Sequence, residues 1–135
     1  MSFDIITIFP EIFDSYFEES LLKRAQQKRL IKIKTHNLRG WTNDTHKTVD
    51  DSPFGGGLGM VMKIDPIAKA ADDLKGKKSK VVLFSPRGKK FTQQKAAEYA
   101  KLDQLIMISG RYEGVDERVS KHIADEVISI GDCVL

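Results

Sequence analysis

Three absences narrow the class of this protein before any motif is considered. Cys133 is the only cysteine among 135 residues, so an internal disulfide is excluded and a reducing compartment is favoured. No apolar run approaches the roughly 18 residues of a membrane-spanning helix. The N-terminus also lacks the basic and then apolar layout of a signal peptide. The sequence therefore predicts a cytoplasmic protein that does not span a membrane.

A large charge of either sign is also missing. The chain carries 22 basic and 19 acidic residues, which gives a formal net charge of +3. Such a small excess points only weakly toward an anionic partner. The length suits one domain with a hydrophobic core of its own, so neither a disulfide nor a metal is needed to hold the fold together.

The common fingerprints of nucleotide and metal sites are absent as well. The run from Gly57 to Gly59 lacks the third spaced glycine of a dinucleotide-binding loop, and no Gly-Lys-Ser or Gly-Lys-Thr follows it to bind phosphate as a P-loop does. His46 has no second histidine or cysteine at ligand spacing. We therefore predict no metal site.

What is present is an alternation of apolar strands and helices, which predicts an α/β fold. Strands are predicted at 3–9, 31–35, 81–84, 105–108 and 126–130. Helices are predicted at 10–24, 64–74, 92–100 and 115–123. Strict alternation at 31–35 indicates a half-exposed edge strand. The sheet should be parallel, so the loops that follow its strands should gather along one edge.

Local signals mark where several helices begin. Pro10 ends the first strand and starts a helix, while Asp65 and Thr92 are suitable caps for two later helices. In the helix after Pro10, apolar residues recur at intervals of three to five residues: Ile12, Phe13, Tyr16, Phe17, Leu21 and Leu22. We predict that this face lies in the core rather than stacking on a cofactor.

Between residues 36 and 63 regular periodicity disappears. A segment of about 28 residues without clear structure is unusual in a compact domain, unless it is functional, contains short elements or is disordered. Its content favours function, because Trp41, His46, Asp50 and Asp51 lead into the glycine-rich run at 53–60. Glycines there permit tight turns and a close approach of the backbone to a ligand.

A second glycine-bracketed loop follows the buried strand at 105–108. Gly110 and Gly114 flank Arg111, Tyr112 and Glu113, at the position where ligands of open α/β sheets bind. A strand-to-helix turn is the simpler alternative. In that case the acidic residues at 116 and 117 would only favour the first turn of the next helix.

Four ordered motifs resemble the bacterial tRNA (guanine-N1)-methyltransferases, the TrmD family of the SPOUT superfamily. They lie at 53–60, 85–88, 110–118 and 129–135, after the opening Ile8-Phe9-Pro10. The resemblance covers the whole chain. It implies a parallel-sheet methyltransferase domain with a trefoil knot, which works as a homodimer. It also implies that S-adenosylmethionine is used to methylate N1 of the guanosine immediately 3′ of the tRNA anticodon.

The same resemblance assigns roles to individual residues. Residues expected to bind the methyl donor are Leu83, Ser85, Pro86, Gly88, Gly110, Tyr112, Glu113, Gly114, Ile130, Gly131, Asp132, Cys133, Val134 and Leu135. Residues expected to approach the guanine are Asp51, Gly55, Gly56, Gly57, Gly59 and Met60. Arg111 and Glu113 would order both pockets, together with Asp51. The general base would be an aspartate beyond Leu135.

Departures from the family pattern are few. Cys133 stands where tyrosine is common, and Ser109 where cysteine is common. The family continues past Leu135 with a knot-closing helix, a linker and a tRNA-binding domain, so the chain resembles an N-terminal fragment that would be inactive alone. Two other classes remain open: an RNA- or nucleotide-binding module without catalysis, and, less favoured, a metal-dependent hydrolase that uses Asp50, Asp51 and His46.

Overall fold

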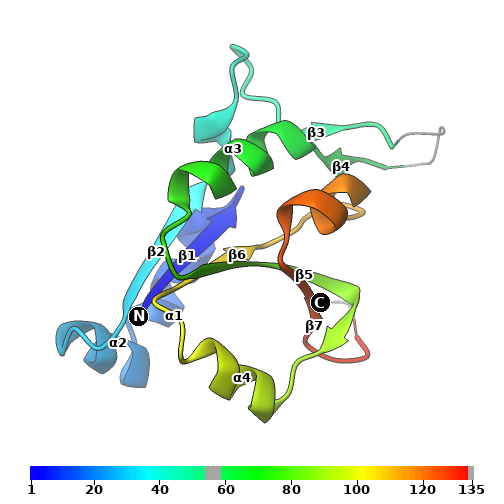
Figure 1. Ribbon diagram of the computed structural model, residues 1–135. Coiled ribbons are helices and arrows are strands. Elements are labelled where there is room, and N and C mark those ends of the chain that lie inside the picture. The colour runs from blue at the N-terminus through cyan, green and yellow to red at the C-terminus, as the bar shows by residue number, and fades with distance from the viewer. Residues whose placement is uncertain (54–58, 134–135) are drawn as a thin grey trace.

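A five-stranded parallel sheet organises the computed structural model, which describes residues 1–53 and 59–133 (Figure 1). Within these residues the strand order is β2-β1-β6-β5-β7. The strands are β1 (Ser2–Thr7), β2 (Lys32–Asn37), β5 (Ser79–Lys90), β6 (Gln104–Ile108) and β7 (Glu126–Ser129). A separate antiparallel ribbon pairs β3 (Asp50–Asp51) with β4 (Val61–Met62). The predicted α/β class and parallel sheet are confirmed, and β2 is the predicted edge strand.

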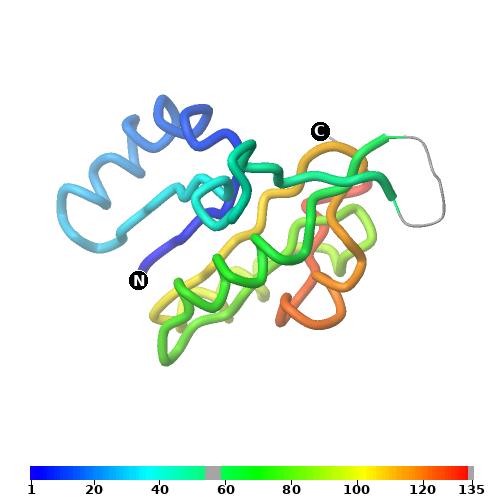
Figure 2. Tube along the Cα trace, turned by 90° about the horizontal axis from the view of Figure 1, so that it is seen from above, coloured from blue at the N-terminus to red at the C-terminus, as the bar shows by residue number. Residues whose placement is uncertain are grey.

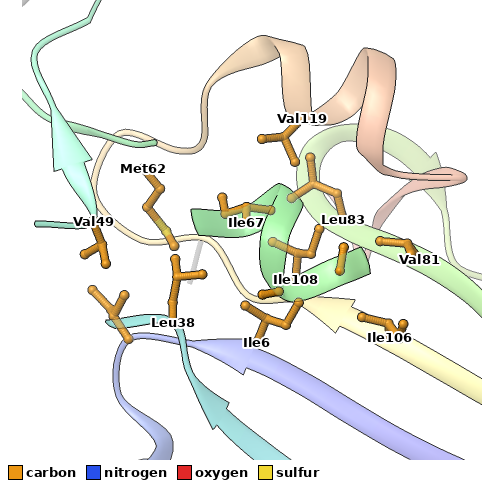
Figure 3. Close-up of a cluster of buried hydrophobic side chains, with 13 residues drawn as sticks. Ile6, Leu38, Val49, Met62, Ile67, Val81, Leu83, Ile106, Ile108 and Val119 are labelled. Carbon is orange, nitrogen blue, oxygen red and sulfur yellow. The ribbon is translucent and has the colours of Figure 1, made fainter. Parts of the chain in front are cut away.

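Apolar side chains cover two neighbouring strands of the sheet, β5 and β6, on both faces. On one face, Val81 and Ile106 pack beneath α3 (Ile64–Leu74), in the cluster drawn in Figure 3. On the other face, Val82 and Leu105 pack with α4 (Gln93–Tyr99). Consecutive strand residues point to opposite faces, so an unbroken apolar run is required where both faces are covered. This explains the apolar residues at 81–83 and 105–108, whereas Phe84, which ends the first run, is exposed.

Two of the predicted helices lie close to where the sequence placed them. The helix α3 spans Ile64–Leu74, although its cap is Lys63, without a side-chain hydrogen bond, and Asp65 lies in the first turn. The predicted cap of α4 is confirmed, because the Thr92 hydroxyl accepts a hydrogen bond from the backbone N–H of Lys95 at 3.2 Å. None of the described helices is long and apolar enough to cross a membrane.

The prediction for residues 10–24 is wrong. Instead of one helix with a buried face there are three short segments, η1 (Pro10–Phe13), α1 (Asp14–Phe17) and α2 (Ser20–Gln27), and none contains a buried residue. Tyr16 and Leu21 are 70% and 74% exposed. Ser20 has a φ of +48°, which interrupts the helical path. The three segments lie to one side of α3 (Figure 2), so the core beneath α3 does not cover their apolar side.

Residues 36–63 follow one of the alternatives that the sequence left open, because they contain short elements that periodicity did not reveal: η2 (Leu38–Trp41), β3 and β4. Two further segments differ from expectation. The helix expected at 115–123 is mainly a π-helical turn, η3 (Val119–Ile123). The loop expected at 85–88 lies inside β5 as a bulge, because Phe84 and Lys89 both pair with Ile128 of β7. The trefoil knot stays a prediction.

A polar cluster joins β5, β7 and α4 on the second face of the sheet. The Glu126 carboxylate accepts hydrogen bonds from Lys80 Nζ at 2.6 Å and from the Tyr99 hydroxyl at 2.7 Å. Burial alone would raise the pKa of Glu126, but these two hydrogen bonds and the charges of Lys80 and Lys95 lower it to about 2. Burial and the hydrogen bond to Glu126 raise the pKa of Tyr99. The carboxylate therefore stays ionised in the folded protein.

Candidate active site

The candidate site is built where three segments from distant parts of the chain lie side by side. Asp50 and Asp51 pair with Met62 and Val61 in the β3–β4 ribbon. Backbone hydrogen bonds then join residues 60–62, which include β4, to residues 113–116 in the loop that follows β6. They run from Glu113 N to Met60 O at 3.1 Å, from Met62 N to Gly114 O at 3.0 Å and from Asp116 N to Met62 O at 3.0 Å. The segment expected to approach guanine is thus fastened to the loop expected to hold the methyl donor.

The loop after β6 makes a tight turn. The backbone N–H of Gly114 donates to the carbonyl of Arg111 at 3.1 Å, and Tyr112 and Gly114 have φ values of +59° and +129°. A residue with a Cβ would be strained at Gly114, so glycine is required there by conformation. Gly110 does not have a positive φ, and a Cβ at this position would lie 3.4 Å from Cγ1 of Val115. Glycine at position 114 is therefore explained by its backbone conformation, whereas at position 110 only the contact with Val115 bears on the choice of residue.

Arg111 and Glu113 lie at the surface of this turn. The Arg111 guanidinium stacks over the ring of Phe9, with its Cζ 5.5 Å from the ring centroid. Its backbone N–H donates to the sulfur of Met62 at 3.2 Å. Phe9 was not among the predicted site residues, although its place at the carboxyl end of β1, just before Pro10, was a usable signal. The cation–π contact ties the end of β1 to the loop after β6.

Asp116 has a structural role at the end of the same loop. Its carboxylate accepts the backbone N–H of Arg118 at 2.9 Å and forms an ion pair with the Arg118 guanidinium, the shortest N–O distance being 2.6 Å. The hydrogen bond from the Arg118 side chain lowers the pKa of Asp116 against the opposing effect of burial. Asp116 therefore stabilises the turn that leads into η3, while the roles expected of Arg111 and Glu113 stay predictions.

The bulge in β5 packs directly on β7. A Cβ added to Gly88 would lie 2.6 Å from the backbone N and C of Ile128 and 2.7 Å from its Cα. Gly88 is therefore required for packing between strands. Leu83 is 2% exposed and belongs to the cluster under α3, so its side chain is not available to a ligand. Ser85 accepts a hydrogen bond from the backbone N–H of Arg87 at 3.3 Å, and Pro86 is exposed.

The end of β7 is held against the same bulge. The Ser129 hydroxyl donates to the carbonyl of Gly131 at 2.7 Å, and the backbone N–H of Phe91 donates to the carbonyl of Ser129 at 2.8 Å. Asp132 lies 3.4 Å from Lys90 Nζ, and Cys133 is an exposed free thiol. Two of the predicted donor segments, the bulge of β5 and the residues after β7, thus lie side by side.

Each of the three predicted donor loops also presents an exposed apolar side chain. Phe84 lies at the start of the bulge in β5, and Tyr112 and Ile130 follow β6 and β7; they are 36%, 49% and 58% exposed. Exposed apolar side chains beside the ends of parallel strands suit a ligand with an apolar face. Phe84 was missed from the sequence because it read as the last residue of a buried strand.

The remaining predicted site residues fall into two groups. Gly55, Gly56, Gly57, Val134 and Leu135 lie outside the described residues. Asp51, Gly59 and Met60 are exposed on the β3–β4 ribbon, beside the loop after β6. Nowhere in residues 1–53 and 59–133 do three or more His, Cys, Asp or Glu side chains group so that they could hold a metal ion.

Comparison with known proteins decides the family. The model of the family described as tRNA (guanine-1)-methyltransferase TrmD matches residues 1–135. The chain belongs to this family. It is similar to the tRNA (guanine-N(1)-)-methyltransferases of Dictyoglomus turgidum (58% identity over 98% of this chain and 54% of the relative), Geobacter sp. strain M21 (51%, 100% and 55%) and Ruminiclostridium cellulolyticum (48%, 100% and 59%). This TrmD-family chain thus spans little more than half the length of these curated relatives.

Proposed function

We propose that the full-length protein transfers a methyl group from S-adenosylmethionine to N1 of the guanosine immediately 3′ of the tRNA anticodon. The match to the TrmD family over the whole chain carries this proposal. The curated relatives named above are tRNA (guanine-N(1)-)-methyltransferases, as their names state. We further propose a trefoil-knotted homodimer that works in the cytoplasm.

The arrangement at the sheet edge supports separate roles for the loops and for the β3–β4 ribbon. The loops at 83–88, 109–114 and 130–135 would bind the donor through backbone groups, with Phe84, Tyr112 and Ile130 against its adenine. The ribbon that carries Asp51, Gly59 and Met60 would face the guanine. Because backbone hydrogen bonds fasten this ribbon to the loop after β6, donor and acceptor would be held in one fixed geometry, which is the main requirement of an in-line transfer.

S-adenosylmethionine supplies an electrophilic methyl group on a sulfonium. Transfer forms the bond from this carbon to guanine N1, breaks the carbon–sulfur bond and requires loss of the N1 proton. A positioned base contributes about 10²–10⁴ in rate to such a step. We place Arg111 and Glu113 around the reacting groups as ordering residues, and the base beyond Leu135. The 135-residue chain alone is then expected to be inactive.

A methylation assay tests the proposal directly. The purified full-length protein is incubated with S-adenosylmethionine and an unmodified tRNA transcript that has guanosine 3′ of the anticodon, and the nucleosides are identified by mass spectrometry. We expect 1-methylguanosine from this transcript and none from a matched transcript with adenosine at that position. Binding of RNA and donor without any methylated product would instead favour a binding module.

A further inference from the structure

Gly59 lies where any side chain would collide with Glu113. A Cβ built on Gly59 would be 2.5 Å from Cγ of Glu113 and 3.2 Å from its Cδ and Oε1. Ordinary van der Waals contacts of a Cβ begin near 3.4 Å. The Glu113 side chain therefore occupies the volume that a residue larger than glycine would fill at position 59.

The two backbones at this contact are held from both sides. The N–H of Glu113 donates to the carbonyl of Met60, and the N–H of Met62 donates to the carbonyl of Gly114. Met62 itself is fully buried in the cluster of Figure 3. The main chains can therefore not separate easily, whereas the Glu113 side chain is exposed and can adopt another rotamer if an atom is added at position 59. A methyl group at position 59 would displace the Glu113 carboxylate rather than open the fold.

We propose that Gly59 is a positioning residue for Glu113. Because it has no side chain, Gly59 keeps the Glu113 carboxylate against the ribbon that carries Asp51 and Met60, and so orients it at the junction of the guanine and donor loops. The inference rests on the proposed function, in which Glu113 orders the reacting groups. It adds a steric cause for glycine at position 59 that does not require contact with guanine.

Four variants of the full-length protein separate this role from backbone strain. Gly59→Ala introduces the Cβ, Glu113→Ala removes all three atoms that it would meet, and the double variant combines both. Gly59 and Gly114 both have a positive φ, +95° and +129°. Gly114→Ala is the matched strain control, because no atom lies within 4 Å of its Cβ position. We expect Gly59→Ala and Gly114→Ala to lower the melting temperature by similar amounts.

Single-turnover methylation of the tRNA transcript, at saturating donor and RNA, tests the coupling. We expect Gly59→Ala to slow the step at least tenfold, and the double variant to be no more than threefold slower than Glu113→Ala alone. If the double variant is slowed by the product of the two single-variant factors, the proposal is overturned. A normal rate for Gly59→Ala alongside a slow Glu113→Ala also overturns it, and in that case the proposed function would stand.

Crystal structures of the parent protein and of Gly59→Ala give a readout that does not depend on activity. We expect the Glu113 side chain to occupy another rotamer in Gly59→Ala while the hydrogen bonds between residues 60–62 and 113–116 persist. An unchanged Glu113 rotamer refutes the positioning role. If Glu113 moves but Glu113→Ala methylates normally, the steric contact is confirmed and the role assigned to Glu113 in the proposed function fails.

Discussion

Replacement of Gly88 by alanine tests how the bulge in β5 is packed. The added Cβ would lie 2.6–2.7 Å from three backbone atoms of Ile128, so β7 or the bulge must shift by about 0.8 Å to restore a 3.4 Å contact. These neighbours are main-chain atoms in a paired strand, and no side chain can rotate to make room. The hydrogen bond from Phe91 N to Ser129 O, at 2.8 Å, lies beside the clash and should weaken.

The expected cost of Gly88→Ala follows from these two effects. Overpacking typically costs about 1–3 kcal/mol, and a lost hydrogen bond adds about 1 kcal/mol. We therefore expect the free energy of unfolding to fall by about 2–4 kcal/mol. For a domain of this size the melting temperature should drop by roughly 8–16 °C, as measured by thermal and urea unfolding followed by circular dichroism.

Gly40 serves as the matched control for Gly88→Ala. Gly40→Ala places its Cβ in open space. It should change the free energy of unfolding by less than about 1 kcal/mol. If Gly88→Ala is as stable as Gly40→Ala, the bulge does not pack on β7 as described.

Three further predictions follow from the site and the sheet. Gly110→Val and Gly131→Val should weaken S-adenosylmethionine binding in calorimetry while the fold persists, and unchanged affinity in both would contradict the assigned donor loops. Arg111→Ala and Glu113→Ala should each lower single-turnover methylation far more than the melting temperature, whereas equal losses would indicate a structural role. The pKa of Glu126 is lowered from 4.5 to about 2, so its stabilising effect is complete above pH 4.5 and is lost as the pH falls toward 2. The loss should be on the order of 1 kcal/mol after solvent screening, and Glu126→Gln should remove this part of the pH dependence of urea unfolding.

Local sequence was sufficient for features that depend on a single element. The apolar runs at 81–84 and 105–108 predicted strands covered on both faces, because side chains alternate along a strand and only double coverage removes the need for polar positions. The bounds of α3 and the Thr92 cap of α4 were also predicted from local sequence, because helix periodicity and capping act within a few residues. The motifs that predicted the family are likewise continuous stretches of the chain.

Contacts between distant segments were decided only by the tertiary structure. Periodicity at 10–24 indicated helical turns but not what covers them, and Tyr16 and Leu21 remain exposed. Nothing local shows that residues 60–62 pair with 113–116, or that Gly88 meets Ile128. From the sequence, Gly59 and Gly88 were expected to let a ligand approach the backbone. In the structure, the atoms nearest to a Cβ at either position belong to another segment of the chain. The physical reason is that these contacts depend on how the elements pack together, whereas a pattern of residues records only the geometry within one element.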